Sequence, residues 1–548
     1  MKSQEYTIKE CDVLVIGGGG SGVLAAIEAS THKNLKIILA SKGPIGQSGL
    51  TPTANGGTAL PASVDEMIKE MVTGGSFLND QKIVWFMANE IQNAIEKLKQ
   101  FAIPIISYNP TRACVPGPET LQILRRELIK RPHVELFEDT LISSLIKSDG
   151  RIVGATALDL TTGEFFTIEA KATIIATGGY AGELYPHTSN NPFGVTTDAS
   201  GTGHAMAYLA GAELIDMEMI QFVPLPANPQ CLHLRYFPDF WAGPYTNRHG
   251  DVLESNIDSY PGKSYSHLFV QKLFRELAKG NGPIFIDQRD LQVQAAGSKV
   301  KSWDQRRKLF KALGIDPHEN KIEIIIGSHF GMGGIRVNEK TETTITGLFA
   351  AGEVMGGVHG GMRIPGYSFT QMIVFGFEAG KQAAHYALEH QRKEEFSQAL
   401  IEHEKEKIFH FLTEPNNPLS GAELKKQLQQ VMNDHVFVVR DKEGLEKATK
   451  VIRAIKRDVS RLSAPTFRRF NLEWARSIEF ALMVDVAEVI VESAQMREES
   501  RGAHFRNDFP HEDNDKWLQH TVTQLKGGQL TLHTSPIEFY RMKPEASS

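Results

Sequence analysis

The chain has 548 residues and a net charge of −6 with its 19 histidines counted as neutral, and 41% of its residues are hydrophobic. This length suggests about three to four domain-sized units, and the apolar content is sufficient to bury several cores. The net charge is slightly negative and does not indicate a basic surface of the kind that binds nucleic acid, so we expect no nucleic-acid partner.

The cysteines and the lack of long apolar runs bear on disulfides, metal sites and membrane segments. Cys11, Cys114 and Cys231 are far apart and odd in number, so they predict neither a disulfide framework nor a zinc or iron–sulfur site in this chain. The sequence has no run of about 20 apolar residues, and its first residues lack the apolar core of a signal peptide. We expect no metal, no direct membrane span, and a cytoplasmic location or one at the inner face of the membrane through partner subunits.

The N-terminal third predicts strands that alternate with helices. Apolar runs and period-two alternation predict strands at 11–16, 35–40, 134–137, 141–147, 152–159, 164–170 and 172–176. Helical periodicity marks 21–30, 63–73 and 81–101. Asp149-Gly150 and Thr162-Gly163 are typical turn pairs.

The rest of the chain changes character twice. From about 224 to 326 the pattern loosens into aromatic and proline-rich loops with one helix at 264–279, which we interpret as an inserted domain. A strand returns at 347–351 and a helix at 376–389, and residues 395–500 are almost all amphipathic helix with the Glu/Lys alternation of solvated faces. The tail predicts strands at 529–533 and 536–542.

The strongest motif is VLVIGGGGSG at residues 13–22, a GxGxxG placed between a predicted strand and a predicted helix. Gly17, Gly19 and Gly22 occupy the glycine positions, and Gly20 and Ser21 open the helix. Such glycines permit a tight turn and let backbone N–H groups and the helix N-terminus face a pyrophosphate. The motif therefore predicts a dinucleotide site.

Two later strands bear on which dinucleotide binds. The second strand ends at Ser41-Lys42, where an acidic ribose partner usually stands, so the first motif leaves NAD and FAD open. The runs TIIATGG (173–179) and TGLFAAGE (346–353) are both typical of strands that deliver glycine turns to one edge of the same sheet. Glu353 would then offer a carboxylate to ribityl or ribose hydroxyls, and its alternative is a solvated acid at a helix cap.

These segments, in this order, resemble the FAD-binding elements of the fumarate reductase/succinate dehydrogenase flavoprotein family, whose relatives include L-aspartate oxidase and the adenylylsulfate reductase alpha subunit. Further segments are similar to family motifs: GGSFLND (74–80), TDASGTGHAMA (197–207), DMEMIQF (216–222), SHFGMGGI (328–335), HGGMR (359–363) and REESRGAHFRNDFP (497–510). The resemblance covers nearly the whole chain and is weakest at about 225–320.

The resemblance implies an α/β fold with a Rossmann-like FAD-binding domain, an inserted α+β capping domain, a helical domain and a small C-terminal segment. The implied boundaries are 1–224 and 329–392 for the two parts of the FAD-binding domain, 225–328 for the capping domain, 393–500 for the helical domain and 501–548 for the C-terminal segment. The residues implied to bind FAD are Gly17, Gly19, Gly20, Ser21, Gly22, Ser41, Lys42, Gly56, Gly57, Thr177, Gly178, Asp198, Glu353, Arg363 and Ser368.

The flavin attachment site departs from the family pattern. Members with covalent FAD carry a histidine in an S-H-T-x-x-x-x-G-G segment, and the matching run here is GLTPTANGG at residues 49–57. Leu50 stands where that histidine would be. We therefore expect FAD to be bound non-covalently.

The substrate residues match the family only in part. His329 and Arg363 match a substrate histidine and the arginine that clamps a carboxylate. A second histidine is replaced by Val223, and the arginine that shuttles the proton is replaced by Ser266. We take His267, beside Ser266, as the third catalytic residue; the other ionisable residues considered for this role are Tyr265, Arg248 and His204.

The resemblance implies an FAD-dependent oxidoreductase in which hydride passes between flavin N5 and a small carboxylate-bearing substrate of the fumarate/succinate type. With no cluster cysteines in this chain, electrons would be exchanged through a partner iron–sulfur subunit, or else the flavin would react with oxygen or a soluble carrier. Val223 and Ser266 keep other interpretations open: a divergent enzyme similar to adenylylsulfate reductase or L-aspartate oxidase with a different substrate, or an electron-transfer flavoprotein subunit without catalysis of its own.

Overall fold

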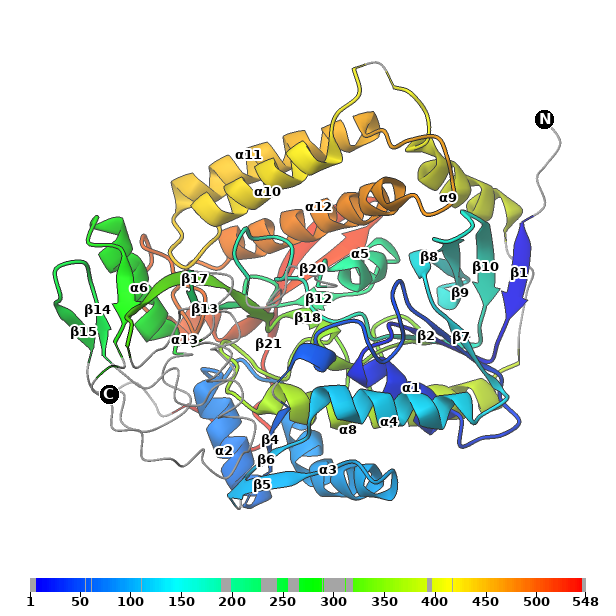
Figure 1. Cartoon of the computed structure of the whole chain (residues 1–548), viewed down its shortest axis with the longest axis horizontal. Coiled ribbons are helices and arrows are strands. Elements are labelled where there is room, and N and C mark those ends of the chain that lie inside the picture. The colour runs from blue at the N-terminus through cyan, green and yellow to red at the C-terminus, as the bar shows by residue number, and fades with distance from the viewer. Residues whose placement is uncertain are drawn as a thin grey trace. The chain divides into compact units, whose positions relative to one another are not determined.

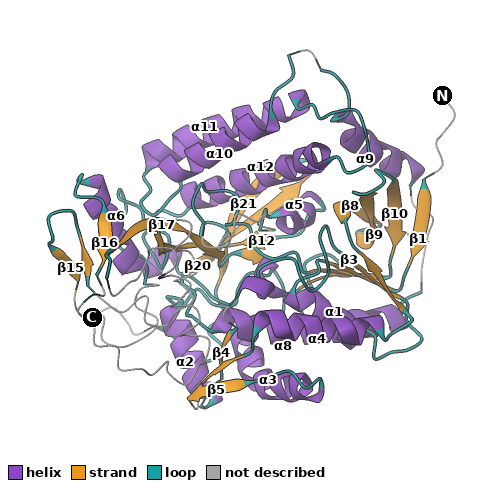
Figure 2. Cartoon of the chain, viewed as in Figure 1, coloured by secondary structure: helices purple, strands orange, loops and turns teal. Residues whose placement is uncertain are grey.

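A computed structural model describes residues 6–54, 56–60, 62–109, 111–188, 199–227, 244–254, 266–287, 289, 311, 319–391, 397–415 and 417–544 (Figure 1). The chain divides into two compact units. Unit 1 consists of Met1–Pro186, Thr197–Ile220 and Phe330–Ser548, and unit 2 of His187–Thr196 and Gln221–His329. Helices and sheets are mixed throughout (Figure 2), which confirms the predicted α/β class.

The centre of unit 1 is a parallel sheet whose strands come from distant parts of the sequence. Its order is β19-β11-β2-β3-β7, with bounds Leu348–Ala350, Ala172–Ile175, Val13–Ile16, Ile37–Ala40 and Val134–Phe137. All of its paired neighbours run parallel. The four strands β19, β11, β2 and β3 are buried along their whole length, because a parallel sheet covered on both faces needs apolar residues on both faces.

Two layers cover this sheet, one of helices and one of strands (Figure 2). Helices α1 (Gly20–Ala29) and α8 (Tyr367–Glu389) pack against the sheet and each other, and α3 (Gln81–Gln100) and α4 (Gly117–Ile129) pack beyond them. The second layer is a four-stranded sheet, order β1-β10-β9-β8, with bounds Thr7–Glu10, Phe165–Glu169, Arg151–Asp159 and Thr140–Ser148. The predicted turns at Asp149-Gly150 and Gly163 are confirmed by backbone φ angles in the left-handed region.

Two smaller sheets complete the strand structure of unit 1. One has the order β4-β6-β5 (Gly57–Ala59, Arg112–Cys114, Ile106–Asn109), and the other has the order β18-β12-β20-β21 (Gly334–Ile335, Leu214–Ile215, Gln519–Lys526, Gln529–Pro536). Helix α2 (Val64–Gly74) begins where the Ser63 hydroxyl accepts a hydrogen bond from the Glu66 amide, and the Asp80 carboxylate caps α3 in the same way. The short elements are α5 (Thr202–Leu209), α13 (Asn514–Trp517), η1 (Thr51–Thr53), η5 (Gly352–Val354) and η6 (Val459–Arg461).

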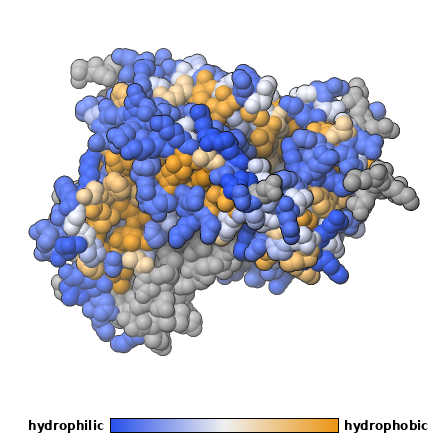
Figure 3. Space-filling view, turned by 90° about the horizontal axis from the view of Figure 1, so that it is seen from above, coloured by the Kyte–Doolittle hydropathy of each residue, from blue (hydrophilic) through white to orange (hydrophobic). Residues whose placement is uncertain are grey.

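The helical region of unit 1 consists of α9 (Gln398–His410), α10 (Gly421–His435), α11 (Lys442–Asp458) and α12 (Leu472–Met496), and the last three lie side by side (Figure 1). Helix α11 buries Leu445, Ala448, Ile452 and Ile455, a spacing that places them on one face. At its edge Lys456 pairs with Asp485 and Glu488 of α12, each at 2.6 Å. The face seen in Figure 3 is largely hydrophilic, with apolar residues showing in smaller areas.

Unit 2 contains a five-stranded sheet and one described helix. The sheet order is β13-β17-β16-β14-β15, with bounds Ile220–Pro226, Ile322–Gly331, Ile284–Ile286, Tyr245–Thr246 and Val252–Glu254. Helix α6 spans His267–Ala278, inside the predicted range 264–279, and buries Phe269, Val270, Gln271 and Leu273.

The tail differs from prediction. The strand predicted at 536–542 is wrong, because β21 already ends at Pro536. The backbone that follows is bound by one side chain instead: Gln81 Oε1 accepts hydrogen bonds from the amides of Arg541 and Met542, at 2.8 and 2.9 Å. Gln81 Nε2 donates to the Met542 carbonyl at 2.7 Å.

Helix α8 begins at Tyr367, ahead of the predicted start at 376.

None of the helices in the described ranges combines the length and the apolar character that crossing a membrane requires.

Candidate active site

The glycine motif forms a tight turn between β2 and α1. Gly17 has a φ of +117°, and a Cβ added there would lie 2.3 Å from the Ala176 carbonyl oxygen. A Cβ on Gly22 would lie 1.9 Å from the Gly17 carbonyl oxygen, so neither position accepts a side chain. Gly19 caps the helix, and an added Cβ there would meet no described atom within 4 Å. The space beside Gly19 at the N-terminus of α1 is therefore open, as a pyrophosphate site requires.

The segment that carries Leu50 lies against this turn. Gly49 has a φ of +80°, and a Cβ added to it would lie 3.8 Å from Gly19 Cα. The Thr51 hydroxyl accepts a hydrogen bond from the Gly20 amide at 3.2 Å. Thr51 thus borders the glycine turn, which the sequence alone did not indicate, because a threonine in a loop gives no signal before its partner is known.

Ser41 and Lys42 end β3 and have different surroundings. Ser41 is buried, and its hydroxyl lies 2.7 Å from where a Cβ on Gly18 would be, so it borders the glycine turn. The Lys42 ammonium forms an ion pair with Glu479 of α12. The structure thus brings the Ser41 hydroxyl to the turn and directs the Lys42 charge to a carboxylate of the helical region.

The turns after β11 and β19 meet at the same edge of the sheet, as predicted. Gly178 has a φ of +77°, and a Cβ there would meet no described atom within 4 Å. Glu353 follows β19, and its Oε1 accepts a hydrogen bond from the Gly331 amide at 3.3 Å. A Cβ on Gly179 would lie 2.0 Å from that oxygen. Glu353 stands in the first turn of η5 and is partly exposed, and burial of its carboxyl raises its pKa to about 7.

These turns fit a dinucleotide cofactor. The open positions at Gly19 and Gly178 could admit a phosphate and a sugar without a clash. Gly57 is also exposed and meets no described atom, whereas Gly56 packs its Cα face against the Val115 carbonyl. Within the described residues the buried hydroxyls of Thr177 and Ser200 have no hydrogen-bond partner, and a ligand rich in hydroxyls and phosphate oxygens would offer one.

Arg363 is a buried cation close to Glu353 and to the start of α8. Its side chain is only 5% exposed, and one of its terminal nitrogens donates to the Ser368 hydroxyl at 3.3 Å. Its guanidinium carbon lies 5.1 Å from the centre of the Phe330 ring. Two opposing effects act on the pKa of Glu353. Burial raises it, and the positive charge of Arg363 lowers it by a smaller amount. Such a buried guanidinium is suited to binding a carboxylate through two of its nitrogens at once.

His359 connects the Arg363 loop to α8 and stays neutral. Its Nε2 lies 2.8 Å from Gln371 Oε1, and Gln371 Nε2 donates to the Gly352 carbonyl at 2.9 Å. Burial, together with the charge of Arg363, lowers the pKa of His359 to about 3. The side chain of His359 therefore positions its neighbours and holds no proton that it could transfer at neutral pH.

The other predicted catalytic residues belong to unit 2. His329 lies near the end of β17, and His267 is the first residue of α6, directly after Ser266 at the N-cap. Both histidines are partly exposed, and desolvation lowers the pKa of His267 to about 4. Val223 is 2% exposed within β13. Asp198 and Tyr265 lie outside the described residues.

The remaining ionisable residues considered for proton transfer have other surroundings. His204 is completely buried in α5, and its ring stands edge-on to Tyr180 with the centroids 5.0 Å apart. Burial lowers the pKa of His204 to about 3. Arg248 is exposed and donates to the Gly282 carbonyl.

The C-terminal motif REESRGAHFRNDFP forms a buried ionic cluster. Arg497 is 0% exposed, and all its side-chain N–H groups are hydrogen-bonded. The acceptors are the carboxylates of Glu218, Glu499 and Asp216 and the backbone carbonyls of Trp517 and Gln519. The His504 Nε2 lies 3.2 Å from the Arg497 carbonyl, and its Nδ1 lies 2.8 Å from an Arg440 nitrogen. His504 therefore carries its proton on Nε2 and is neutral, consistent with a pKa far below the usual value.

Comparison with known proteins agrees with this geometry. The family model for the FAD binding domain matches residues 12–369, and the model for the fumarate reductase flavoprotein C-terminal region matches residues 425–548. One component of the CoM/CoB fumarate reductase of Methanothermobacter marburgensis is 32% identical, over 96% of this chain and 98% of that protein. The chain belongs to the fumarate reductase/succinate dehydrogenase flavoprotein family.

Two further relatives agree in length and fold. An uncharacterized FAD-dependent oxidoreductase of Methanocaldococcus jannaschii is 33% identical, over 95% of this chain and 97% of that protein. A flavoprotein chain of Escherichia coli quinol fumarate reductase superposes with a TM-score of 0.88 at 25% identity, over 98% of this chain and 99% of that chain. The cofactor is FAD, and the protein is an FAD-dependent oxidoreductase.

Replacing Gly17 tests the glycine turn. Gly17→Ala should lower the affinity for FAD by about tenfold or more, because a Cβ at a φ of +117° would strain the backbone and clash with Ala176. The measurement is the ratio of FAD to protein after gel filtration, together with the melting temperature. Gly421→Ala, at the start of α10 where an added Cβ has room, is the control and should keep its full FAD content. Full occupancy in Gly17→Ala would contradict the assignment.

Proposed function

We propose that this chain is the flavoprotein subunit of an enzyme that transfers hydride between flavin N5 and a small carboxylate-bearing substrate of the fumarate/succinate type. The observation that carries the proposal is Arg363, a buried guanidinium beside Ser368 in the same region as the glycine turns. The planar fork of a guanidinium matches a carboxylate with two parallel hydrogen bonds, so Arg363 is suited to bind a substrate carboxylate. The relatives named as fumarate reductases support the same substrate class.

Bound FAD would supply the hydride acceptor and donor for this reaction. The residues of the chain would bind and orient the substrate, with Arg363 gripping one carboxylate and His329 donating a hydrogen bond to it. Glu353, with a pKa of about 7, would hold ribityl or ribose hydroxyls and can do so in either protonation state. In this arrangement the protein contributes mainly positioning.

His267 is the proposed proton carrier. Its pKa of about 4 makes it neutral at pH 7, so only a small fraction of His267 carries the proton that reduction of the substrate would require. The replacement of the family's proton-shuttling arginine by Ser266 fits a proton path that differs from the usual one.

The proposed partner is an iron–sulfur subunit that exchanges single electrons with the flavin. Support comes from the family and from the Methanothermobacter marburgensis relative, whose name describes it as one subunit of its fumarate reductase. A location at the cytoplasmic face of the membrane, reached through that partner, follows from the same proposal.

Val223 and Ser266 favour a second candidate, a divergent member of the family with another substrate. Where other members place a histidine, Val223 is a buried apolar side chain that cannot bind a carboxylate. An enzyme similar to adenylylsulfate reductase or L-aspartate oxidase would show turnover with its own substrate. An electron-transfer subunit without catalysis would turn over none of these compounds.

The Leu50 argument predicts non-covalent FAD. Acid precipitation of the purified protein should release all the flavin into the supernatant, because leucine offers no nucleophile for attachment. The measurement is flavin absorbance in the supernatant and flavin fluorescence of the polypeptide in a denaturing gel. Flavin that stays with the polypeptide would show that the attachment argument is wrong.

The carboxylate clamp is tested by fumarate-dependent oxidation of a reduced viologen. We expect wild-type turnover, and a fall in kcat/KM on the order of 100-fold in Arg363→Lys per bound flavin, since lysine cannot make the paired contact. Arg336→Lys is the control, because Arg336 pairs with Glu213 at 3.0 Å and should keep wild-type kinetics. Absence of wild-type turnover would reject fumarate as the substrate, and a fully active Arg363→Lys variant would reject the clamp.

The pH profile tests His267. If His267 donates the proton, fumarate reduction should accelerate about tenfold per pH unit as the pH falls from 7 towards 4, because the protonated fraction rises in that proportion. His267→Gln should lose this slope and retain its FAD. A flat profile in the wild type, or an unchanged slope in the variant, would exclude His267 as the donor.

A further inference from the structure

The loop that carries Arg363, residues 357–363, is here termed the clamp loop. It is held by the turn between α2 and α3, residues 75–80, here termed the Ser76 turn. Three hydrogen bonds join them, each 2.8 Å long: Asp80 N–H to the Gly357 carbonyl, Asn79 Nδ2 to the Val358 carbonyl, and Gly361 N–H to the Gly75 carbonyl. The position of Arg363 therefore depends on the shape of the Ser76 turn.

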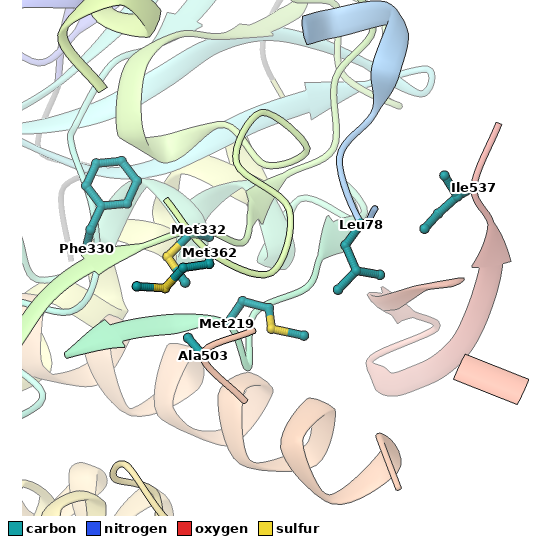
Figure 4. Close-up of a cluster of buried hydrophobic side chains, with 7 residues drawn as sticks. All are labelled: Leu78, Met219, Phe330, Met332, Met362, Ala503 and Ile537. Atoms are coloured by element: carbon teal, nitrogen blue, oxygen red, sulfur yellow. The ribbon is translucent and has the colours of Figure 1, made fainter. Parts of the chain in front are cut away.

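The Ser76 turn is strained and needs support from outside. Ser76 and Phe77 are consecutive non-glycine residues in the left-handed region, with φ angles of 52° and 61°. Such a conformation persists only where surrounding contacts fix it. Leu78, the next residue, is completely buried in an apolar cluster with Met362 and Ala503 (Figure 4).

Arg501 provides a polar support for this turn. Its side chain is 2% exposed, and one terminal nitrogen donates to the Ser76 carbonyl at 3.2 Å. Glu499 fixes the rest of the guanidinium through two contacts, Nε to Oε1 at 2.8 Å and the second terminal nitrogen to Oε2 at 2.9 Å. Glu499 is itself held by Arg497 at 2.8 Å. The planar fork of arginine suits this double contact, which lysine cannot reproduce.

The backbone that follows Arg501 reaches the clamp loop directly. The Ala503 amide donates to the Gly361 carbonyl at 2.8 Å. Gly502 has a φ of +54°, and a Cβ added there would lie 2.3 Å from the same carbonyl oxygen. Gly361 lies two residues before Arg363. Its N–H thus donates to the Ser76 turn, and its carbonyl accepts from the backbone that follows Arg501.

From these contacts we propose that Arg501 is a positioning residue for the substrate clamp. It acts through the Ser76 turn and Gly361 and touches neither the substrate nor the flavin. The inference rests on the proposed role of Arg363. It assigns to the C-terminal segment a share in carboxylate binding as well as in stability.

The test compares Arg501→Lys with Arg506→Lys in the purified flavin-loaded chain. Arg506 is a matched control because it is 1% exposed and binds Asp508 through two contacts, at 2.8 and 2.7 Å. Its other hydrogen bonds go to carbonyls at the end of α12 and none of them to the Ser76 turn. Both variants should lose stability, and only Arg501→Lys should disturb the clamp loop.

Two readouts separate this inference from the proposed function. Amide hydrogen exchange of peptides covering 357–363 should become about tenfold faster in Arg501→Lys and stay unchanged in Arg506→Lys, with or without a known substrate. With fumarate, KM should rise about tenfold in Arg501→Lys with a smaller change in kcat. Unchanged exchange in Arg501→Lys, or equal changes in both variants, would overturn the inference. Altered exchange in an enzyme that does not turn over fumarate would support the inference and reject the substrate.

If Arg501→Lys yields no folded protein, Gly502→Ala tests the same contact from the other side. Its Cβ would press on the Gly361 carbonyl and leave the Arg501 side chain in place. We expect the same faster exchange at 357–363. Wild-type exchange in this variant would overturn the inference.

Discussion

Parallel pairing of β19, β11 and β2 brings together three segments that are more than 150 residues apart in the sequence. In a parallel sheet the carboxyl ends of the strands point to one edge, so the turns after Ile16, Ile175 and Ala350 must share that edge. Glycine is required at Gly17 because the backbones nearly touch there: a Cβ added to Gly17 would lie 2.3 Å from the Ala176 carbonyl oxygen. The same edge keeps open space at Gly19 and Gly178, where a dinucleotide could lie.

A second constraint is the cost of burying charge. Asp216, Glu218 and Glu499 are at most 2% exposed, and they form ion pairs with Arg497 and Arg501 in the same cluster. Removing one partner from such a cluster leaves an uncompensated buried charge, which typically costs about 3–5 kcal/mol. Fully bonded buried ions also admit few alternative arrangements, which suits a segment that fixes a loop in the active site. This ties the C-terminal segment to the clamp loop more firmly than apolar contact alone would.

The sequence predicted the parts of the fold that are locally encoded. Strands β2 and β11 are apolar runs, and helices α2 and α3 follow the helical periodicity at 63–73 and 81–101, so a short window contains the signal. Strand β20 was missed because its residues, QHTVTQLK, include several polar ones that are buried by pairing with the distant β12. The 536–542 strand was wrong because Gln81, far away in the sequence, binds that backbone. Candidate residues for FAD binding could be proposed from motifs, whereas the pKa of Glu353 and the hydrogen bond from Arg501 to Ser76 depend on packing that no motif encodes.

The central claim is that the flavin of this chain exchanges hydride with a C4 dicarboxylate bound by Arg363. The most direct measurement is a single-turnover experiment in which the photoreduced protein is mixed with fumarate without oxygen, and the flavin absorbance is followed. The account predicts full return of the oxidised flavin spectrum, with one succinate formed per flavin, and loss of this phase when Arg363 is replaced by lysine. A flavin that stays reduced in the presence of fumarate, yet is reoxidised by another acceptor, would contradict the account.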